Sequence, residues 1–225
     1  MPKLRIQAKP SAVTIESHET ALLVIDMQKD FVYKGGYGES LGNNPEILQR
    51  TIKPVQTLLA KAREKGMLII HTREGHLPDL SDCPMTKLLR WPTGKRIGDL
   101  GPMGRILIRG EEGHAIIDEA KPLSGEIVID KPGKNAFYKT NLDALLREHK
   151  IVNLLIAGVT TDVCCSTTIS GANDHGFNAI VLSDCVAAYD ESRHLAALDI
   201  IQAQGGIFGW VAESKDVLGE LEKIL

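Results

Sequence analysis

The chain has 225 residues, 43% of them hydrophobic and 24% charged, and a net charge of −3; these values predict one globular domain over 1–225 with an N-terminal extension at 1–18. The slightly acidic balance argues against nucleic-acid or anionic-membrane partners, and no apolar run approaches the roughly 20 residues that span a bilayer. Because the polar N-terminus also lacks the apolar stretch of a secretory signal, we expect a cytoplasmic protein whose four cysteines stay reduced.

Short apolar runs that predict strands alternate with longer segments of helical periodicity. In chain order they are a strand at Ala21–Asp26, a helix at Pro45–Lys65, strands at Met67–His71 and Glu126–Asp130, a helix at Asn141–His149, a strand at Ile151–Gly158, a helix at Asp162–His175, a strand at Asn178–Ser183, a helix at Ser192–Gln204, a short sixth strand at Gly206–Val211 and a helix at Ser214–Ile224. Apolar strands separated by helices are typical of a parallel sheet covered on both faces. We therefore predict a Rossmann-like α/β domain, a three-layer α/β/α structure with a mostly parallel, doubly wound sheet of six strands.

Two segments fall outside this alternation. Tyr33–Asn44 is rich in glycine, and Thr72–Gly113 is long and has little periodicity. Loops of this length inside a compact domain are usually functional. They predict either a functional loop such as a lid over a site, or a surface excursion or subunit contact without a role in the site.

Three reactive side chains fall at the carboxyl ends of predicted strands, where open parallel sheets bind their ligands. Asp26 ends the first strand, Lys131 follows the third, and Cys164 lies just after the fourth, where a helix begins. We expect the helix start and the ammonium to lower the pKa of the thiol, and the carboxylate to move its proton. Backbone N–H groups of the turn at 160–164 are candidates to receive an oxyanion. The set predicts acyl transfer by a cysteine nucleophile without histidine or metal.

Each of these residues taken alone also fits a structural role. A cysteine near a helix start is often a small buried hydrophobe, an aspartate at a strand end is commonly a turn or cap residue, and a lysine there is usually solvated. The hypothesis of a catalytic site therefore depends on their coincidence at one edge of the sheet.

The chain resembles the isochorismatase-like cysteine hydrolases in three motifs that occur in the family's order and spacing: VIDMQKDF, DKPGKNAF and GVTTDVCCSTT. The resemblance covers most of the chain, from about Ala21 to Trp210. It implies the isochorismatase-like hydrolase fold and a catalytic triad that acts through a thioester. In that triad, Asp26 is the general acid and base, Lys131 the supporting cation and Cys164 the nucleophile.

The third motif carries two further implications of the same resemblance. Val159 and Thr160 match a non-proline cis peptide of the family, which helps to form the oxyanion site. Cys165 departs from the family, where an aliphatic residue is more usual, and it leaves open which of the adjacent thiols reacts.

Further segments resemble a subgroup of this family, the biuret and triuret hydrolases, which cleave linear urea-like amides in nitrogen metabolism: HTREGHLPDL, IGDLGPMGRIL, RGEEGH and AQGGIFGW. This closer resemblance implies that Lys134 and Gln204 hold the distal carbonyl and amide of a small substrate and that Phe31 packs against it. The resemblance to the family as a whole implies a homo-oligomer, often a tetramer, and we expect no cofactor.

Alternatives within the family differ in metal use and in the bond that is cleaved. Nicotinamidases hold a metal on aspartate and histidine after the second strand; Glu74 and His76 match the start of that set, but no further histidine follows until His114, so we expect no metal. Isochorismatases cleave a vinyl ether and can dispense with the cysteine. A ureidoacrylate or N-carbamoyl amidohydrolase is the nearest enzymatic alternative.

Two readings come from outside the family. A dinucleotide-binding dehydrogenase would need G-x-G-x-x-G directly after the first strand, where this chain has MQKDFVYKGGYG. A non-catalytic scaffold with the same fold would have no need of an aspartate, a lysine and a cysteine kept together.

Overall fold

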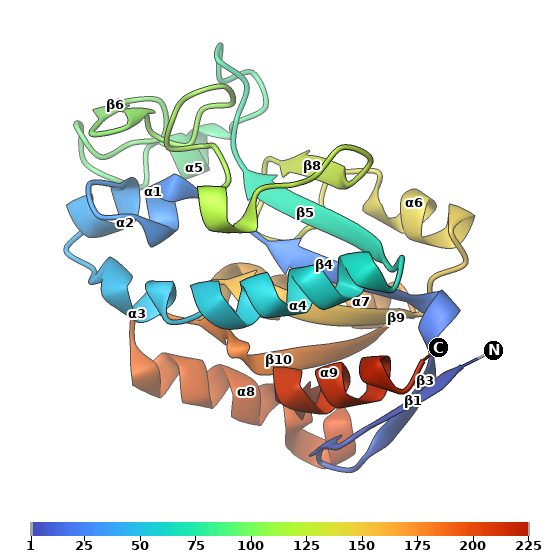
Figure 1. Ribbon diagram of the computed structural model, residues 1–225. Coiled ribbons are helices and arrows are strands. Elements are labelled where there is room, and N and C mark those ends of the chain that lie inside the picture. Colours follow the sequence, from blue (N-terminus) through green and yellow to red (C-terminus); the bar gives the residue numbers. More distant parts are fainter. Residues whose placement is uncertain (1, 225) are drawn as a thin grey trace.

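The computed structural model describes residues 2–224, and a seven-stranded sheet lies at its centre (Figure 1). The strands follow the order β2-β11-β10-β9-β4-β5-β8 across the sheet. Their bounds are β2 (Ala8–Lys9), β4 (Thr20–Ile25), β5 (Leu68–Glu74), β8 (Ile127–Lys131), β9 (Asn153–Val159), β10 (Asn178–Ala187) and β11 (Trp210–Ala212). The six predicted strands are present and parallel. The prediction missed β2, which the N-terminal extension adds antiparallel to β11, and the four short strands outside this sheet.

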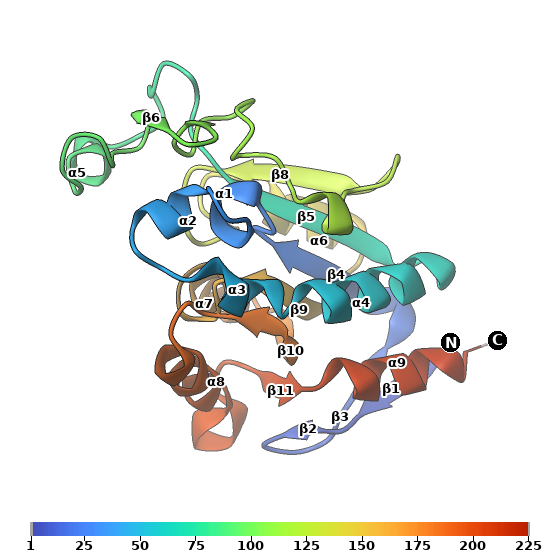
Figure 2. The same ribbon diagram turned by 60° about the vertical axis from the view of Figure 1, so that its left-hand side comes forward.

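Helices cover both faces of the sheet, as predicted for a three-layer fold. One face carries α4 (Ile52–Glu64) and α9 (Ser214–Glu222), and the other carries α6 (Leu142–Glu148), α7 (Ser166–Asp174) and α8 (Glu191–Gly206) (Figures 1 and 2). The buried side chains form a separate cluster on each face, because successive residues of a strand point to opposite sides.

The remaining elements are short. They are β1 (Lys3–Ile6), β3 (Val13–Glu16), η1 (Ser17–Glu19), α1 (Lys29–Val32), α2 (Tyr37–Ser40), α3 (Pro45–Gln49), α5 (Met85–Leu88), β6 (Leu100–Gly101), β7 (Gly104–Arg105), η2 (Asp118–Ala120) and the π-helical turn η3 (Thr161–Cys165). Within 2–224, no helix combines the length and the apolar character that crossing a bilayer requires.

The helix predicted at Pro45–Lys65 is two helices, α3 and α4, that meet at Arg50 and Thr51. Pro54 explains the break, because in a continuous helix its ring would clash with the carbonyl of Arg50 and it has no N–H to donate. In the first turn of a new helix the missing N–H costs nothing, and Pro54 lies in the first turn of α4.

The two irregular segments lie together beyond the carboxyl ends of the parallel strands (Figure 2). Asp30 joins them: its buried carboxylate accepts hydrogen bonds from the backbone N–H of Tyr37 at 3.2 Å and of Leu107 at 3.5 Å. The start of the second segment is in fact strand, because β5 continues three residues beyond His71 to Glu74.

Gly158 allows β9 to pass β4 at close range just before the strand ends. Its φ is +112°, and a Cβ at this position would lie 2.0 Å from the backbone oxygen of Ile25. Both the backbone conformation and the contact therefore require glycine.

We expect Gly158→Ala to destabilise the fold by about 3 kcal/mol or more. The new Cβ would clash with the backbone of Ile25 in the central strand β4, and the positive φ is unfavourable for alanine. Gly219→Ala is the matched control, since Gly219 lies in α9 and a Cβ there meets no atom within 4 Å. The control should be neutral or stabilising by up to about 1 kcal/mol. Urea unfolding of both variants checks this, and equal stabilities would contradict the assignment.

Candidate active site

The structure brings the three predicted reactive residues together at the carboxyl edge of the sheet. Asp26 directly follows β4, Lys131 is the last residue of β8, and Cys164 lies in η3 after β9. All three are buried, and the Nζ of Lys131 lies 2.7 Å from Oδ2 of Asp26. The parallel topology produces this meeting, because it places the ends of β4, β8 and β9 on one side.

Local hydrogen bonds fix the Asp26–Lys131 ion pair in place. Asp26 has a left-handed backbone, with φ of 48°, and its Oδ1 accepts a hydrogen bond from Oγ1 of Thr72 at 2.7 Å. The ammonium of Lys131 also donates to the carbonyl of Gly133 at 2.9 Å. Burial lowers the pKa of Lys131, but the negative groups around it, Asp26 first, outweigh burial and hold that pKa above its usual value, so the lysine is charged.

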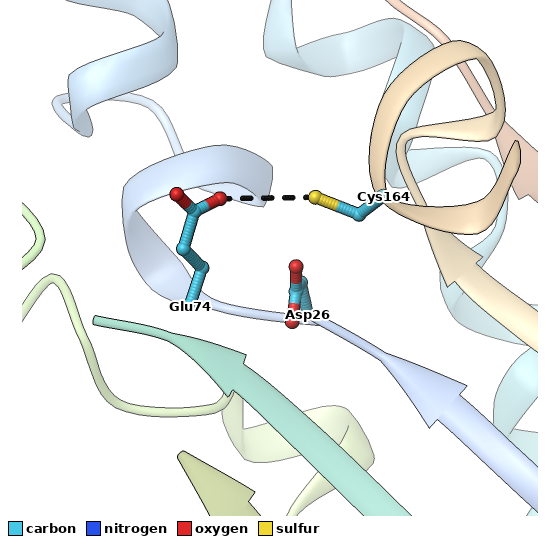
Figure 3. A group of neighbouring side chains, drawn as sticks. All are labelled: Asp26, Glu74 and Cys164. Carbon is cyan, nitrogen blue, oxygen red and sulfur yellow. Dashed lines mark hydrogen bonds between the residues drawn. The ribbon is translucent and has the colours of Figure 1, made fainter. Parts of the chain in front are cut away.

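A second carboxylate, Glu74, faces the same thiol (Figure 3). Glu74 ends β5 and has no exposed surface, and its Oε2 lies 3.8 Å from Sγ of Cys164. One oxygen each of Asp26 and Glu74 and the Cys164 sulfur lie within 4.8 Å of one another. The sequence indicated Glu74 only as a match to a metal ligand, because the predicted strand ended at His71. Thr72 and Glu74 are alternate residues of the longer strand and share one side of it, and this spacing is the signal that identifies Glu74.

Three ammonium groups surround the Glu74 carboxylate. Nζ of Lys134 lies 2.6 and 2.7 Å from its two oxygens, and Nζ of Lys87 lies 3.1 Å from Oε1. Burial raises the pKa of Glu74, but the charges of Lys134, Lys131 and Lys87 outweigh burial and lower this pKa to about 2. The carboxylate is therefore ionised at neutral pH.

The thiol of Cys164 is buried beside these charges, and its pKa differs from the expectation. Burial raises the pKa well above the usual value, Asp26 and Glu74 raise it further, and Lys131 and Lys134 lower it by less. The prediction of a lowered pKa is wrong for the free protein, because burial destabilises the thiolate by more than the neighbouring ammonium groups stabilise it. The thiol is protonated at neutral pH and needs a base such as Asp26.

Cys165 lies apart from this chemistry. It is fully buried in the apolar cluster beneath α7, and burial raises its pKa above the usual value. Of the two adjacent thiols, Cys164 lines a cavity and Cys165 does not.

A cavity of about 440 Å³ opens over the Cys164 sulfur. Four of the five predicted substrate contacts line it: Phe31, Lys134, Val159 and Thr160. Further lining side chains come from the two irregular segments, from the loop before α8 and from α8 itself, and they include Tyr37, Glu74, Lys87, Arg90, Trp91, Tyr189 and Arg193. The irregular segments therefore supply a wall of the cavity.

The turn between β9 and Cys164 has the predicted backbone. The peptide bond between Val159 and Thr160 is cis. The carbonyl of Thr160 accepts hydrogen bonds from the N–H groups of Val163 at 3.2 Å and Cys165 at 3.0 Å.

Gln204 does not line this cavity, so its predicted contact with the substrate stays a prediction. Helix α8 begins near the site, where Nδ1 of His194 lies 2.9 Å from Oγ1 of Thr161, but it runs away from it. Gln204 lies ten residues further on, about 15 Å at the helical rise. It is exposed and has a φ of 50°, where the helix breaks before Gly205.

The donors around Glu74 do not suit a metal ion. The ammonium of Lys87 lies between the two residues that match the nicotinamidase ligands, 3.1 Å from Oε1 of Glu74 and 3.0 Å from Nε2 of His76. Both carboxylates beside Cys164 are already paired with lysines. A divalent cation here would meet three fixed positive charges.

The isochorismatase domain family matches residues 20–216. Ureidoacrylate amidohydrolase RutB of Cronobacter sakazakii is 30% identical over 220 residues, which is 95% of this chain and 93% of the relative, and that of Serratia proteamaculans is 29% identical over 93% and 86%. A crystal structure of a cysteine hydrolase from Pseudomonas syringae pv. phaseolicola superimposes with a TM-score of 0.80 at 27% identity, over 99% and 98% of the two chains. N-carbamoylsarcosine amidase from Thermoplasma acidophilum shares the fold, with a TM-score of 0.66 at 23% identity, over 87% and 96%.

The raised pKa of Cys164 predicts how alkylation depends on pH. We expect the rate of Cys164 modification by iodoacetamide to rise with pH through and beyond neutrality, because the reactive thiolate is scarce at pH 7. Asp26→Asn should shift this curve to lower pH, because it removes a negative charge beside the sulfur. Peptide mass spectrometry after timed alkylation measures the site, and Cys165→Val should follow the wild-type curve. A rate that is already constant below pH 7 would contradict the assignment.

Proposed function

The chain belongs to the isochorismatase family, and we propose that it hydrolyses a C–N bond of a small linear urea-type amide, of the biuret or triuret kind, with Cys164 as nucleophile. The observation that carries this proposal is the Cys164 sulfur at a cavity wall, with the Asp26–Lys131 ion pair beside it. An aspartate and a lysine held at a thiol supply the proton transfer and the charge that acyl transfer needs.

In the proposed first half-reaction, Asp26 takes the thiol proton while the sulfur attacks the substrate carbonyl carbon. The carbonyl oxygen becomes negatively charged and is stabilised by N–H groups of the turn after Val159. Asp26 then passes the proton to the leaving nitrogen, the C–N bond breaks, and the amine or ammonia departs. The acyl group remains on Cys164 as a thioester.

In the second half-reaction, Asp26 takes a proton from water as the water oxygen attacks the thioester carbon. The C–S bond breaks, the acid product leaves, and the proton returns to the sulfur of Cys164. Lys131 stays charged throughout and stabilises the Asp26 carboxylate whenever the carboxylate is ionised. The cycle regenerates the thiol and consumes one water.

A urea-type substrate fits the polar groups of the cavity. Such a chain alternates carbonyl acceptors with N–H donors, and here Lys134 offers a donor within 2.7 Å of Glu74, an acceptor. Both groups lie at the Cys164 wall, and Phe31 contributes an apolar side. A substrate that carries both acceptors and donors can hydrogen-bond to the Lys134 ammonium and to the Glu74 carboxylate at the same wall.

A second candidate substrate is a urea-type amide that carries a carboxylate, such as the ureidoacrylate in the names of the Cronobacter and Serratia relatives. The cavity is lined by two exposed arginines, Arg90 and Arg193, in addition to Lys87 and Lys134. Neither guanidinium is paired with a carboxylate in the part of the chain that the structure describes. A bidentate arginine contact is the usual partner of a carboxylate.

Ammonia release from a panel of amides tests the proposal. The panel holds biuret, triuret, ureidoacrylate, N-carbamoyl amino acids and nicotinamide. We expect turnover of biuret or triuret that is lost in Cys164→Ser, and near wild-type turnover in Cys165→Val, because only the first thiol reaches the cavity. Preferred turnover of ureidoacrylate would select the carboxylate-bearing class. Activity that survives in Cys164→Ser would overturn the mechanism, and no turnover by the wild-type protein would favour a scaffold.

Metal removal is expected to leave turnover unchanged, because lysine ammonium groups occupy the cationic positions around Glu74. Prolonged dialysis against a strong chelator, followed by the ammonia assay with and without added Zn²⁺ or Mn²⁺, measures this. Loss of turnover that added metal restores would contradict the charge assignment at Glu74.

A further inference from the structure

Two lysines from different segments share the carboxylate of Glu74. Lys134 follows β8 and lies within 2.7 Å of both oxygens, whereas Lys87 comes from α5 in the long irregular segment and reaches Oε1 at 3.1 Å. The carboxylate itself is completely buried. A buried carboxylate that loses its only cationic partner strongly destabilises the folded protein. A second lysine at Glu74 prevents this when the first one moves away.

The two lysines differ in what else holds them. The Lys134 side chain is 43% exposed and lines the cavity, and its described polar contacts are the two oxygens of Glu74. Lys134 can donate to a substrate carbonyl only by giving up part of this contact. Without another cation, the charge of Glu74 would then be left without a close partner on that side.

Lys87 is held from behind as well as by Glu74. Its ammonium lies 2.8 Å from the carbonyl of Pro132 and 3.0 Å from Nε2 of His76. His76 is fully buried, and its other ring nitrogen, Nδ1, lies 3.0 Å from Oδ1 of Asp82. With Nδ1 donating to Asp82, Nε2 is an acceptor, so the three N–H donors of the ammonium all have partners.

We propose that Lys87 is a positioning residue that keeps Glu74 charge-paired when Lys134 turns from Glu74 to the substrate. Lys87 acts through Glu74 and does not itself contact the reacting atoms, because its three donors are already used. The arrangement gives the irregular segment a role in substrate binding through charge as well as through the shape of the cavity. The proposal rests on the proposed function, in which Lys134 binds a substrate carbonyl.

Steady-state kinetics of Lys87→Met and Lys87→Arg test this role. We expect Lys87→Met to lower kcat/KM about tenfold or more, mainly by raising KM, because Lys134 then stays on Glu74. The acid limb of the kcat/KM profile should move to higher pH, since Glu74 loses a neighbouring positive charge. Lys87→Arg, which keeps the charge, should recover part of the loss. Lys95→Met, an exposed lysine of the same segment, is the matched control and should equal wild type.

Two readouts separate this role from a merely structural one. Ethylammonium added to Lys87→Ala should restore turnover in a saturable way, because a free cation can occupy the place of the missing one. Lys87→Met should also cost less in a Glu74→Gln background, where no charge needs a partner. An unchanged KM, or an equal loss in both backgrounds without rescue, overturns the proposal.

A measurement without substrate distinguishes the failure of this proposal from the failure of the proposed function. The pKa of the Glu74 carboxyl, followed by carbon-13 NMR, should rise by about one unit or more in Lys87→Met and stay unchanged in Lys95→Met. An unchanged pKa of Glu74 in Lys87→Met would contradict the proposed role of Lys87. A wild-type protein that turns over no amide of the panel defeats the proposed function, even when this shift is observed.

Discussion

The balance of buried charge at the carboxyl edge of the sheet is the constraint on which the site depends. Two carboxylates, Asp26 and Glu74, lie without solvent exposure within reach of one thiol. They are tolerated there because lysines pair with both of them, Lys131 with the first and Lys134 with the second. Removing one partner of such a pair leaves an unpaired buried charge, which is costly. The charged groups must therefore be present together.

The parallel sheet supplies half of this arrangement, and the irregular segments supply the other half. Asp26 and Lys131 lie at the carboxyl ends of β4 and β8, on either side of β5, where the parallel register brings them together. The cavity wall and Lys87 come from chain beyond the strands, which has a small apolar cluster of its own and is tied to the first irregular segment through Asp30. Rigid strands thus hold the reacting groups, while the segments outside the sheet determine the shape and charge around them.

Much of the fold follows from periodicity, and much of the triad follows from the rule on strand ends. The six parallel strands and the positions of Asp26, Lys131 and Cys164 at one edge were predictable in this way. The role of Glu74 at the thiol was missed because the polar residues of HTRE interrupt the apolar run by which the strand was predicted, although the strand continues through them. The break before Pro54 was missed because apolar spacing alone does not account for the backbone restrictions of proline. The pKa direction of Cys164 depends on burial depth, which a one-dimensional pattern does not contain.

The N-terminal extension finishes one edge of the sheet in a particular way. Edge strands present free N–H and C=O groups to which a strand of another molecule can add, and this is a route to aggregation. Here the outermost strand, β2, has only two residues, it carries the charged Lys9, and Pro10 follows with no N–H to offer. The extension thus covers β11 and leaves little for an incoming strand to pair with, so a peripheral strand of two residues helps to keep the sheet from growing.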